Sequence, residues 1–329
     1  MHSCHRIPRL AAVAACLAVI AGAGMAQDAP WPSQPIRFIV PYTPGGGTDT
    51  VTRHIAEKMA ASAKWVFLVD NKPGAGGNIG MDAVAKSRPD GYTIGMGQTA
   101  NIAINPALVG KMPFDAARDL VPVALVAQLP MVMVVKEDAP WKSLGELIES
   151  AKSRPGAVKQ ALAGTGTVGH LSGEMLARRA GIQVLNIPYK GAAPALTDLI
   201  GGQTDYMFAS PQSVMGMIKG GKLRALAVSS SRRLPILPDV PTVAESGYKD
   251  FVAVDWKAIV APAGTRADIV KRLNAEAARA LTEPAMISTL ANEGSIPMTG
   301  GPEQAASFIR SEQARWGSLI REAGIKVEQ

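Results

Sequence analysis

Short apolar runs alternate with longer amphipathic stretches along most of this chain of 329 residues. The runs have the length of buried strands, and the stretches between them have the periodicity of helices. The alternation predicts an α/β fold with mostly parallel sheets. We expect strands at 36–40, 65–69, 92–96, 120–126, 131–135, 159–163, 184–187, 206–209, 223–228 and 252–261, and helices at 50–61, 78–86, 144–152, 171–180, 194–200, 267–281 and 303–323.

The length of the chain predicts two lobes, because about 300 residues is large for one doubly wound sheet. Two β-like segments, 120–135 with Pro130 inside it and 251–261, are the expected crossings between the lobes. The first lobe is then 27–126 plus 251–329, and the second is 127–250. A chain that leaves a lobe and returns to it suggests a hinged pair with a ligand cleft between.

The N-terminus has the pattern of a secretory signal peptide, residues 1–26. Arg6 and Arg9 precede an uncharged apolar run, and small residues precede a cut after Ala26. The run is too short to span a bilayer, so we expect a soluble protein exported to the periplasm. An alternative is a lipoprotein cleavage box at 13–16, which would leave a lipidated Cys16.

The composition excludes several kinds of site. Both cysteines, Cys4 and Cys16, lie in the signal peptide, so disulfides, zinc–thiolate sites and cysteine nucleophiles are excluded from the mature chain. His54 and His170 stand outside any HExxH spacing, and the chain has no GxSxG elbow. Basic and acidic residues are interspersed, which argues against nucleic-acid binding and is compatible with attraction of small anions.

Three Gly-rich loops, 43–49, 73–80 and 164–169, stand between a predicted strand and a predicted helix. Such a loop lets a ligand approach the backbone, and the helix behind it aims unpaired N–H groups at that ligand. The pattern therefore predicts an anion site. The alternative is a plain strand–helix turn, with glycine for positive φ and threonine as the helix cap.

The loop at 164–169 also matches GxGxxG, the dinucleotide fingerprint. That site needs an acidic residue at the end of the next strand, whereas this strand ends in 186–189 without one. No P-loop motif occurs either. We therefore expect neither a nucleotide nor any other cofactor.

Several single residues have two interpretations. Asp49 or Thr48 is expected to cap the helix that follows, and a capping Asp49 could also hold a ligand ammonium group. His170 is expected to pack and form hydrogen bonds in its loop rather than act as a base. Asp205 is either a turn residue or a cleft carboxylate, and Trp256 either packs the hinge or stacks on a ligand.

A series of motifs resembles the substrate-binding proteins of tripartite tricarboxylate transporters, the Bug receptor family, over nearly the whole mature chain. The resemblance implies a two-lobed, type II-like periplasmic binding protein fold that closes on a small ligand, usually a carboxylate, and presents it to a membrane permease. It also implies that loops 42–49 and 164–170 hold the carboxylate. The motifs lie at 39–49, 69–77, 90–93, 105–108, 188–195, 199–205, 223–228 and 239–245.

The chain departs from the family pattern in two places. Family members often carry Ser and Asn in the loop that is 163–170 here. This chain therefore has a different pattern of hydroxyl groups in that loop. Trp256 is followed by Lys257 and Ala258, where the family often has an aromatic residue and glycine. Lys257 either enters the cleft and pairs with a second acid group or points to water, and we expect the latter.

We therefore expect a monomeric periplasmic solute receptor, not an enzyme, that works by hinge closure. Its partners would be a small carboxylate and permease subunits, with no metal and no nucleic acid. The alternatives are an exported receptor domain that signals to a membrane sensor, and an exported α/β hydrolase or oxidoreductase. The candidate ligand-binding residues are Tyr42, Gly46, Gly47, Thr48, Asp49, Thr99, Thr165, Gly166, Thr167, His170 and Asp205.

Overall fold

The computed structural model describes Met1 and residues 31–45, 47–189, 191–292 and 294–325. The chain divides into two compact units, Met1–Ser33 and Gln34–Gln329, and the helices and strands of the described residues belong to the second unit. The predicted signal peptide after Met1, with Cys16, lies outside the described residues, as does Gly46. No helix in the described ranges combines the length and apolar character that crossing a membrane requires.

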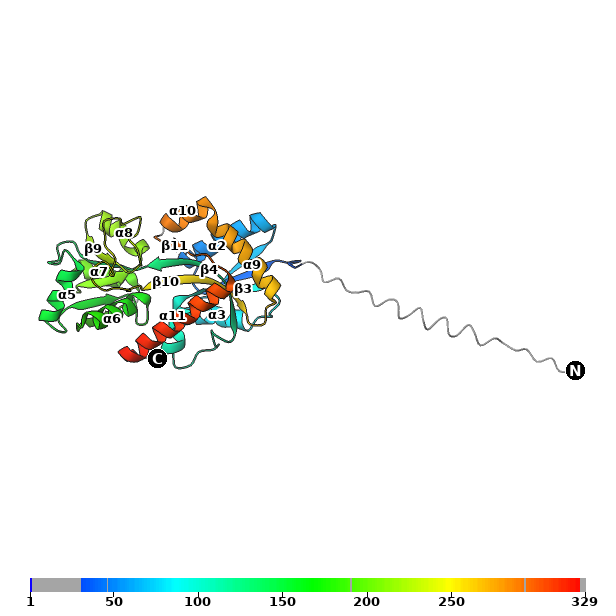
Figure 1. Cartoon of the computed structure of the whole chain (residues 1–329), viewed down its shortest axis with the longest axis horizontal. Coiled ribbons are helices and arrows are strands. Elements are labelled where there is room, and N and C mark those ends of the chain that lie inside the picture. The colour runs from blue at the N-terminus through cyan, green and yellow to red at the C-terminus, as the bar shows by residue number, and fades with distance from the viewer. Residues whose placement is uncertain (2–30, 46, 190, 293, 326–329) are drawn as a thin grey trace. The chain divides into compact units, whose positions relative to one another are not determined.

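The first sheet has six strands in the order β11-β4-β10-β3-β1-β2 (Figure 1). Strand β1 runs parallel to β2 and to β3, whereas β10 runs antiparallel to β3 and to β4. The strands are β1 (Ile36–Val40), β2 (Phe67–Asn71), β3 (Thr93–Gln98), β4 (Leu120–Pro130), β10 (Val254–Pro262) and β11 (Ile296–Pro297).

The second sheet has five strands in the order β7-β6-β8-β5-β9. Strand β6 runs parallel to β7 and β8, and β5 runs antiparallel to β8 and β9. Both sheets are therefore mixed, and the expectation of mostly parallel sheets was wrong, because the strands next to each crossing run against their neighbours. The strands are β5 (Val132–Lys136), β6 (Lys159–Leu162), β7 (Leu185–Pro188), β8 (Tyr206–Ala209) and β9 (Leu223–Val228).

The seven predicted helices are present with ends shifted by three residues or fewer. The short elements α4, α8, α10 and β11, the 3₁₀ helix η2 and the π-helix η3 were not predicted. The helices and turns are α2 (Gly47–Ala63), η2 (Ala75–Gly77), α3 (Asn78–Ala85), η3 (Ala100–Ile104), α4 (Asn105–Leu108), α5 (Leu144–Ser153), α6 (Val168–Ala180), α7 (Ala192–Ile200), α8 (Pro211–Lys219), α9 (Ala267–Thr282), α10 (Pro284–Asn292) and α11 (Pro302–Ala323).

The chain passes between the two sheets at two places that meet at one buried serine. Met131 alone separates β4 from β5, and β10 begins just after Ala253. The Ser229 hydroxyl accepts from the Met131 N–H at 2.8 Å and donates to the Ala253 carbonyl. The main chain of Ser229 also bonds to Met131 and Ala253, at 2.9 Å each. Both passages are thus fastened to the end of β9.

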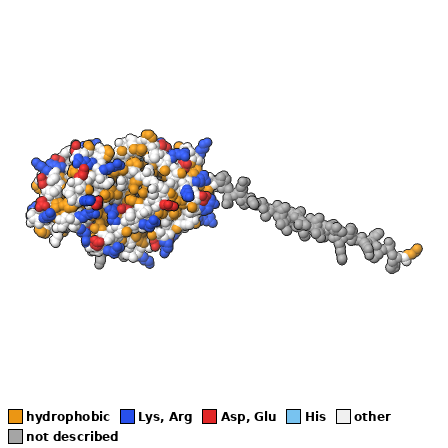
Figure 2. Space-filling view, in the orientation of Figure 1, with side chains coloured by type: hydrophobic (Ala, Val, Ile, Leu, Met, Phe, Trp, Pro, Cys, Tyr) orange, Lys and Arg blue, Asp and Glu red, His pale blue; other side chains and the backbone are white. Residues whose placement is uncertain are grey.

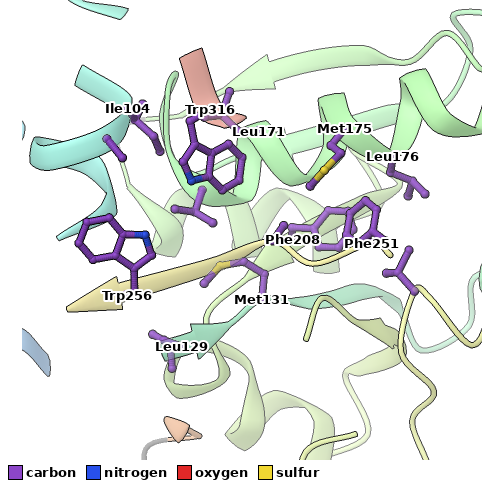
Figure 3. Close-up of a cluster of buried hydrophobic side chains, with 14 of the residues drawn as sticks. Ile104, Leu129, Met131, Leu171, Met175, Leu176, Phe208, Phe251, Trp256 and Trp316 are labelled. Carbon is purple, nitrogen blue, oxygen red and sulfur yellow. The ribbon is translucent and has the colours of Figure 1, made fainter. Parts of the chain in front are cut away.

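Charged side chains are spread over the surface, and apolar ones fill the interior. On the visible face, Lys and Arg side chains lie interspersed with Asp and Glu (Figure 2). Inside, one apolar cluster contains Met131 at the first passage, Phe208 of the second sheet, Trp256 of the first sheet and Trp316 of α11 (Figure 3). Side chains from both sheets therefore share a continuous core beside the two passages.

Candidate functional site

The carboxyl ends of β1, β2 and β3 lie at one edge of the first sheet, because these strands are parallel. Tyr42 follows β1 there, and its hydroxyl accepts from Asn101 Nδ2 at 3.2 Å and donates to the Gly76 carbonyl at 3.4 Å. Burial, with the charge of Asp255 as a second cause, raises the pKa of Tyr42. Gly77 lies so close that a Cβ there would approach Asn101 Nδ2 to 2.5 Å. The Gly-rich loop at 73–80 thus packs around Tyr42.

Asp49 lies in the first turn of α2, not at its cap, since the helix begins at Gly47. Its carboxylate accepts from the Gly45 N–H at 2.9 Å, from Asn71 Nδ2 at 2.9 Å and from Arg53 Nε at 3.0 Å. Burial acts to raise the pKa of Asp49, but these hydrogen bonds outweigh it and lower the pKa. Both carboxylate oxygens are therefore occupied in holding the loop, and Asp49 is not free to bind a ligand ammonium group.

Thr48 and Thr99 connect this loop to the neighbouring strands. The Thr48 hydroxyl, at the start of α2, accepts from Gln98 Nε2 at the end of β3. The Thr99 hydroxyl, fully buried, accepts from the Trp256 N–H at 2.7 Å. Asp255 is bonded to Thr99 as well, and burial raises the pKa of Asp255. The start of α2, the end of β3 and strand β10 thus form one connected polar region.

The loop 164–170 follows β6 at the carboxyl edge of the second sheet. The Gly166 N–H donates to His170 Nδ1 at 3.0 Å, so this N–H is not free for a ligand. The Thr167 hydroxyl caps α6 by accepting from the His170 N–H at 3.3 Å, and it donates to the Gly164 carbonyl at 2.9 Å. Thr165 is exposed.

His170 is buried at 5% exposure, and its Nε2 lies 3.8 Å from a Glu174 carboxylate oxygen. The contact with His170 lowers the pKa of Glu174. His170 therefore orders its loop, as expected. The N–H groups of Val168 and Gly169, in the first turn of α6, meet no acceptor among the described residues, as is usual at a helix start.

A third helix start at the same edge was missed in the sequence. Helix α8 begins at Pro211, directly after β8, and the hydroxyl of its cap Ser210 lies 2.9 Å from that of Ser213. Proline after serine is a recognisable helix start, so this signal was present in the sequence. It was overlooked because the short apolar segment that follows has no glycine-rich loop before it.

The two carboxyl edges face each other across short distances. A Cβ built on Gly47 of α2 would lie 3.9 Å from Gln212 Nε2 of α8. Gly166 has φ +76°, and a Cβ there would collide with the side chain of Leu108. Leu108 is the last residue of α4, which follows β3 of the first sheet. The structure therefore brings the starts of α2, α6 and α8 together between the two sheets.

Asp205 is not brought together with these residues. It precedes β8, at the amino end of that strand, and its carboxylate accepts from the Lys159 N–H at 2.7 Å. It lines a separate cavity of about 380 Å³ that also contains Lys136 and Arg154. Asp205 thus has the turn role that was one of its two interpretations, because a strand places its two ends on opposite edges of the sheet.

Two residues of β10 can now be placed. Trp256 is fully buried, and its indole N–H donates to Glu312 of α11 at 3.0 Å, so it packs the core. Lys257 is only 4% exposed. The expectation that Lys257 points to water was wrong, because β10 is an inner strand with β3 on one side and β4 on the other.

Comparison with known proteins identifies the family. The profile of the tripartite tricarboxylate transporter family receptor matches residues 51–325. The chain belongs to this receptor family. Protein BugT of Bordetella pertussis is similar to this receptor, with 40% identity over 313 residues, 94% of this chain and 96% of that protein.

Two solved structures with bound carboxylates resemble this receptor. Rpa4515 of R. palustris with adipate has a TM-score of 0.78 and 33% identity, and the match covers 90% of this chain and 99% of that one. MatC (Rpa3494) from Rhodopseudomonas palustris with bound malate has a TM-score of 0.73 and 31% identity, covering 88% and 100%. The similarity confirms the predicted periplasmic binding protein fold.

The helix starts of this receptor provide hydrogen-bond donors that suit an anion. Three helix starts converge on one region, and a carboxylate there would accept N–H hydrogen bonds that water would otherwise take. Among the described residues, no group of three or more His, Cys, Asp or Glu side chains is arranged to hold a metal ion. Backbone N–H groups at these helix starts can recognise an anion.

Proposed function

We propose that this receptor binds a small carboxylate in the periplasm and delivers it to the permease of a tripartite tricarboxylate transporter. The observation that carries the proposal is the convergence of the starts of α2, α6 and α8. The adipate and malate bound by its structural relatives support the ligand class. The protein would act without changing the ligand, since the hydroxyl and imidazole groups of 164–170 are engaged in ordering their own loop.

The mechanism would be hinge closure. The lobes would be 27–126 plus 251–329 and 127–250, joined at Met131 and Ala253. A ligand held at one edge would recruit the other edge and shift the balance toward the closed form. Residues 1–26 would be removed during export, and the mature protein would act as a monomer.

Isothermal titration calorimetry of the mature protein tests the proposal. We expect at least one member of a panel of monocarboxylates, dicarboxylates, tricarboxylates and acidic amino acids to bind with a Kd of about 1 μM or tighter, near −8 kcal/mol. The ligand should be recovered unchanged by mass spectrometry after prolonged incubation. Failure of the whole panel to bind, or conversion of the ligand, would overturn the proposal.

A further inference from the structure

Lys257 faces the region of the α2 start rather than α11. Successive side chains of a strand point to opposite faces of the sheet. Trp256 points to α11, where Glu312 accepts its indole N–H, so Lys257 points to the other face. Its antiparallel partner is Gln98 of β3, and paired residues of neighbouring strands share a face.

Gln98 shows what lies on that face. Its side chain donates to the Thr48 hydroxyl in the first turn of α2. The Lys257 side chain therefore lies on the same face of the sheet as the start of α2 and the loop before it. This loop and helix start would receive a ligand carboxylate.

The Lys257 residue is buried, and its ammonium forms no ion pair at contact distance with the described residues. It is 4% exposed, and no carboxylate of the described residues lies within 4.0 Å of its ammonium. Asp255 is the neighbouring acid on the same face. Burial raises the pKa of Asp255, and the charge of Lys257 opposes that rise, ahead of hydrogen bonds from Thr99 and Trp256. Glu312 lies on the opposite face. Asp255 acts on Lys257 from beyond contact distance and is itself held by Thr99 and Trp256, so the Lys257 ammonium can still pair with an anion from outside the chain.

We propose that Lys257 binds a second carboxylate of the ligand and makes this receptor selective for dicarboxylates over monocarboxylates of the same length. The inference rests on the proposed function, because the first carboxylate is the one held at the helix starts.

Calorimetry with matched pairs of acids tests this selectivity. The pairs are adipate and hexanoate, malate and 3-hydroxybutyrate, and succinate and butyrate, each titrated into wild type, Lys257→Met and Lys257→Arg. Methionine keeps the length of the side chain and removes its charge. Lys86→Met is the matched control, because Lys86 is an exposed lysine paired with Asp82 on α3.

For the wild type we expect a dicarboxylate to bind at least about tenfold more tightly than its monocarboxylate partner. Lys257→Met should lose that preference while its affinity for the monocarboxylate stays within about threefold of wild type, and Lys257→Arg should keep most of the preference. Lys86→Met should behave as wild type. Melting curves of each variant establish that the protein is folded.

Two outcomes would overturn the inference separately from the proposed function. If wild type binds carboxylates but treats the members of each pair alike, only the selectivity is wrong. If Lys257→Met keeps the preference, Lys257 is not its source. If folded wild type binds no member of the panel, the proposed function itself fails, and the role of Lys257 fails with it.

Discussion

Asp49 is the residue on which the first binding loop depends. It lies in the first turn of α2 and holds Gly45, Asn71 and Arg53 at the same time. A carboxylate so placed stabilises the conformation of the loop. It fixes the loop conformation in advance, and a ligand then loses less free energy in ordering the site.

Asp49→Asn should lower the free energy of unfolding at pH 7 by about 1–3 kcal/mol, toward the lower end because Arg53 is half exposed. The pKa of Asp49 is lower in the folded protein than the usual value of about 3.9. Its contribution is therefore complete above that value and is lost as the pH falls through the folded pKa. Urea unfolding from pH 7 to pH 3 should show the gap between wild type and variant closing below about pH 4. A difference in the free energy of unfolding between wild type and variant that does not change with pH would contradict the role assigned to the Asp49 carboxylate.

Two features require glycine at position 166: the positive φ of its backbone and the nearby side chain of Leu108. Gly166 and Gly156 share a φ of +76°, but a Cβ on Gly156 meets open space whereas one on Gly166 collides with Leu108. Gly156→Ala should therefore cost about 1 kcal/mol, the effect of φ alone. Gly166→Ala should cost more and weaken carboxylate binding, and adding Leu108→Ala should restore part of the loss. Equal effects of the two alanine substitutions in denaturation and calorimetry would contradict this.

At the level of residues, the sequence predicted positions better than roles. Tyr42, Thr48 and Thr99 lie where a strand-to-loop pattern places them, and all take part in one polar region. The Gly166 N–H was expected to be free, yet His170 takes it, because the rotamer of a side chain four residues later is invisible in a sequence. The burial of Lys257 was missed for a related reason, since it depends on which strands flank β10.

Among the elements, the two passages between the sheets depend on Ser229. Its hydroxyl bonds to Met131 before β5 and to Ala253 before β10. The Ser229 side chain, at the end of β9, therefore links Met131 and Ala253, which lie about a hundred residues or more apart in the sequence. These bonds hold the region where any rotation of one sheet against the other would have to occur.

Ser229→Ala should lower the free energy of unfolding by about 1–3 kcal/mol, because it leaves the buried Met131 N–H without its side-chain acceptor. Ser295→Ala is a matched control, since the Ser295 hydroxyl is buried and has no hydrogen-bond partner among the described residues. That substitution should be neutral or stabilising. Guanidinium denaturation of both variants measures the difference, and a Ser229→Ala protein as stable as Ser295→Ala would exclude the proposed role of the hydroxyl.

The length of an element did not decide whether it could be predicted. Strands β1, β8 and β9 were predicted to the residue, and α11 to within one residue. Helix α8 was missed although it is as long as α7, which was predicted, whereas strand β11 is too short for periodicity to distinguish it from a loop. The antiparallel pairing of β10 with β3 and β4 follows from the path of the returning chain, which no local pattern records.

For the whole molecule, the expected behaviour is a change of shape on binding. The two sheets have separate strand sets, joined through Met131 and through Ala253, and the starts of α2, α6 and α8 lie between them. A ligand that bridges these starts favours the arrangement in which they are close. The ratio of the ligand's affinities for the closed and open arrangements determines how far the population of molecules shifts toward the closed one.

Small-angle X-ray scattering of the mature protein should therefore show a smaller radius of gyration when a bound acid from the panel is saturating. At about one hundred times its Kd, the same acid should add about 2.7 kcal/mol to the free energy of unfolding. Sodium chloride at matched ionic strength is the control. Tight binding by calorimetry with an unchanged radius of gyration would contradict closure while leaving binding intact.

Strand β10 carries Lys257 and also leads the chain back from the second sheet to the first. Its pairing with β4 is irregular between Lys257 and Ala258, a feature that bends and twists a strand. A substitution at position 257 would therefore fall both beside the proposed ligand site and at a bend of the strand that joins the two sheets. A change of ligand at this position would then be accompanied by a change in that joining strand.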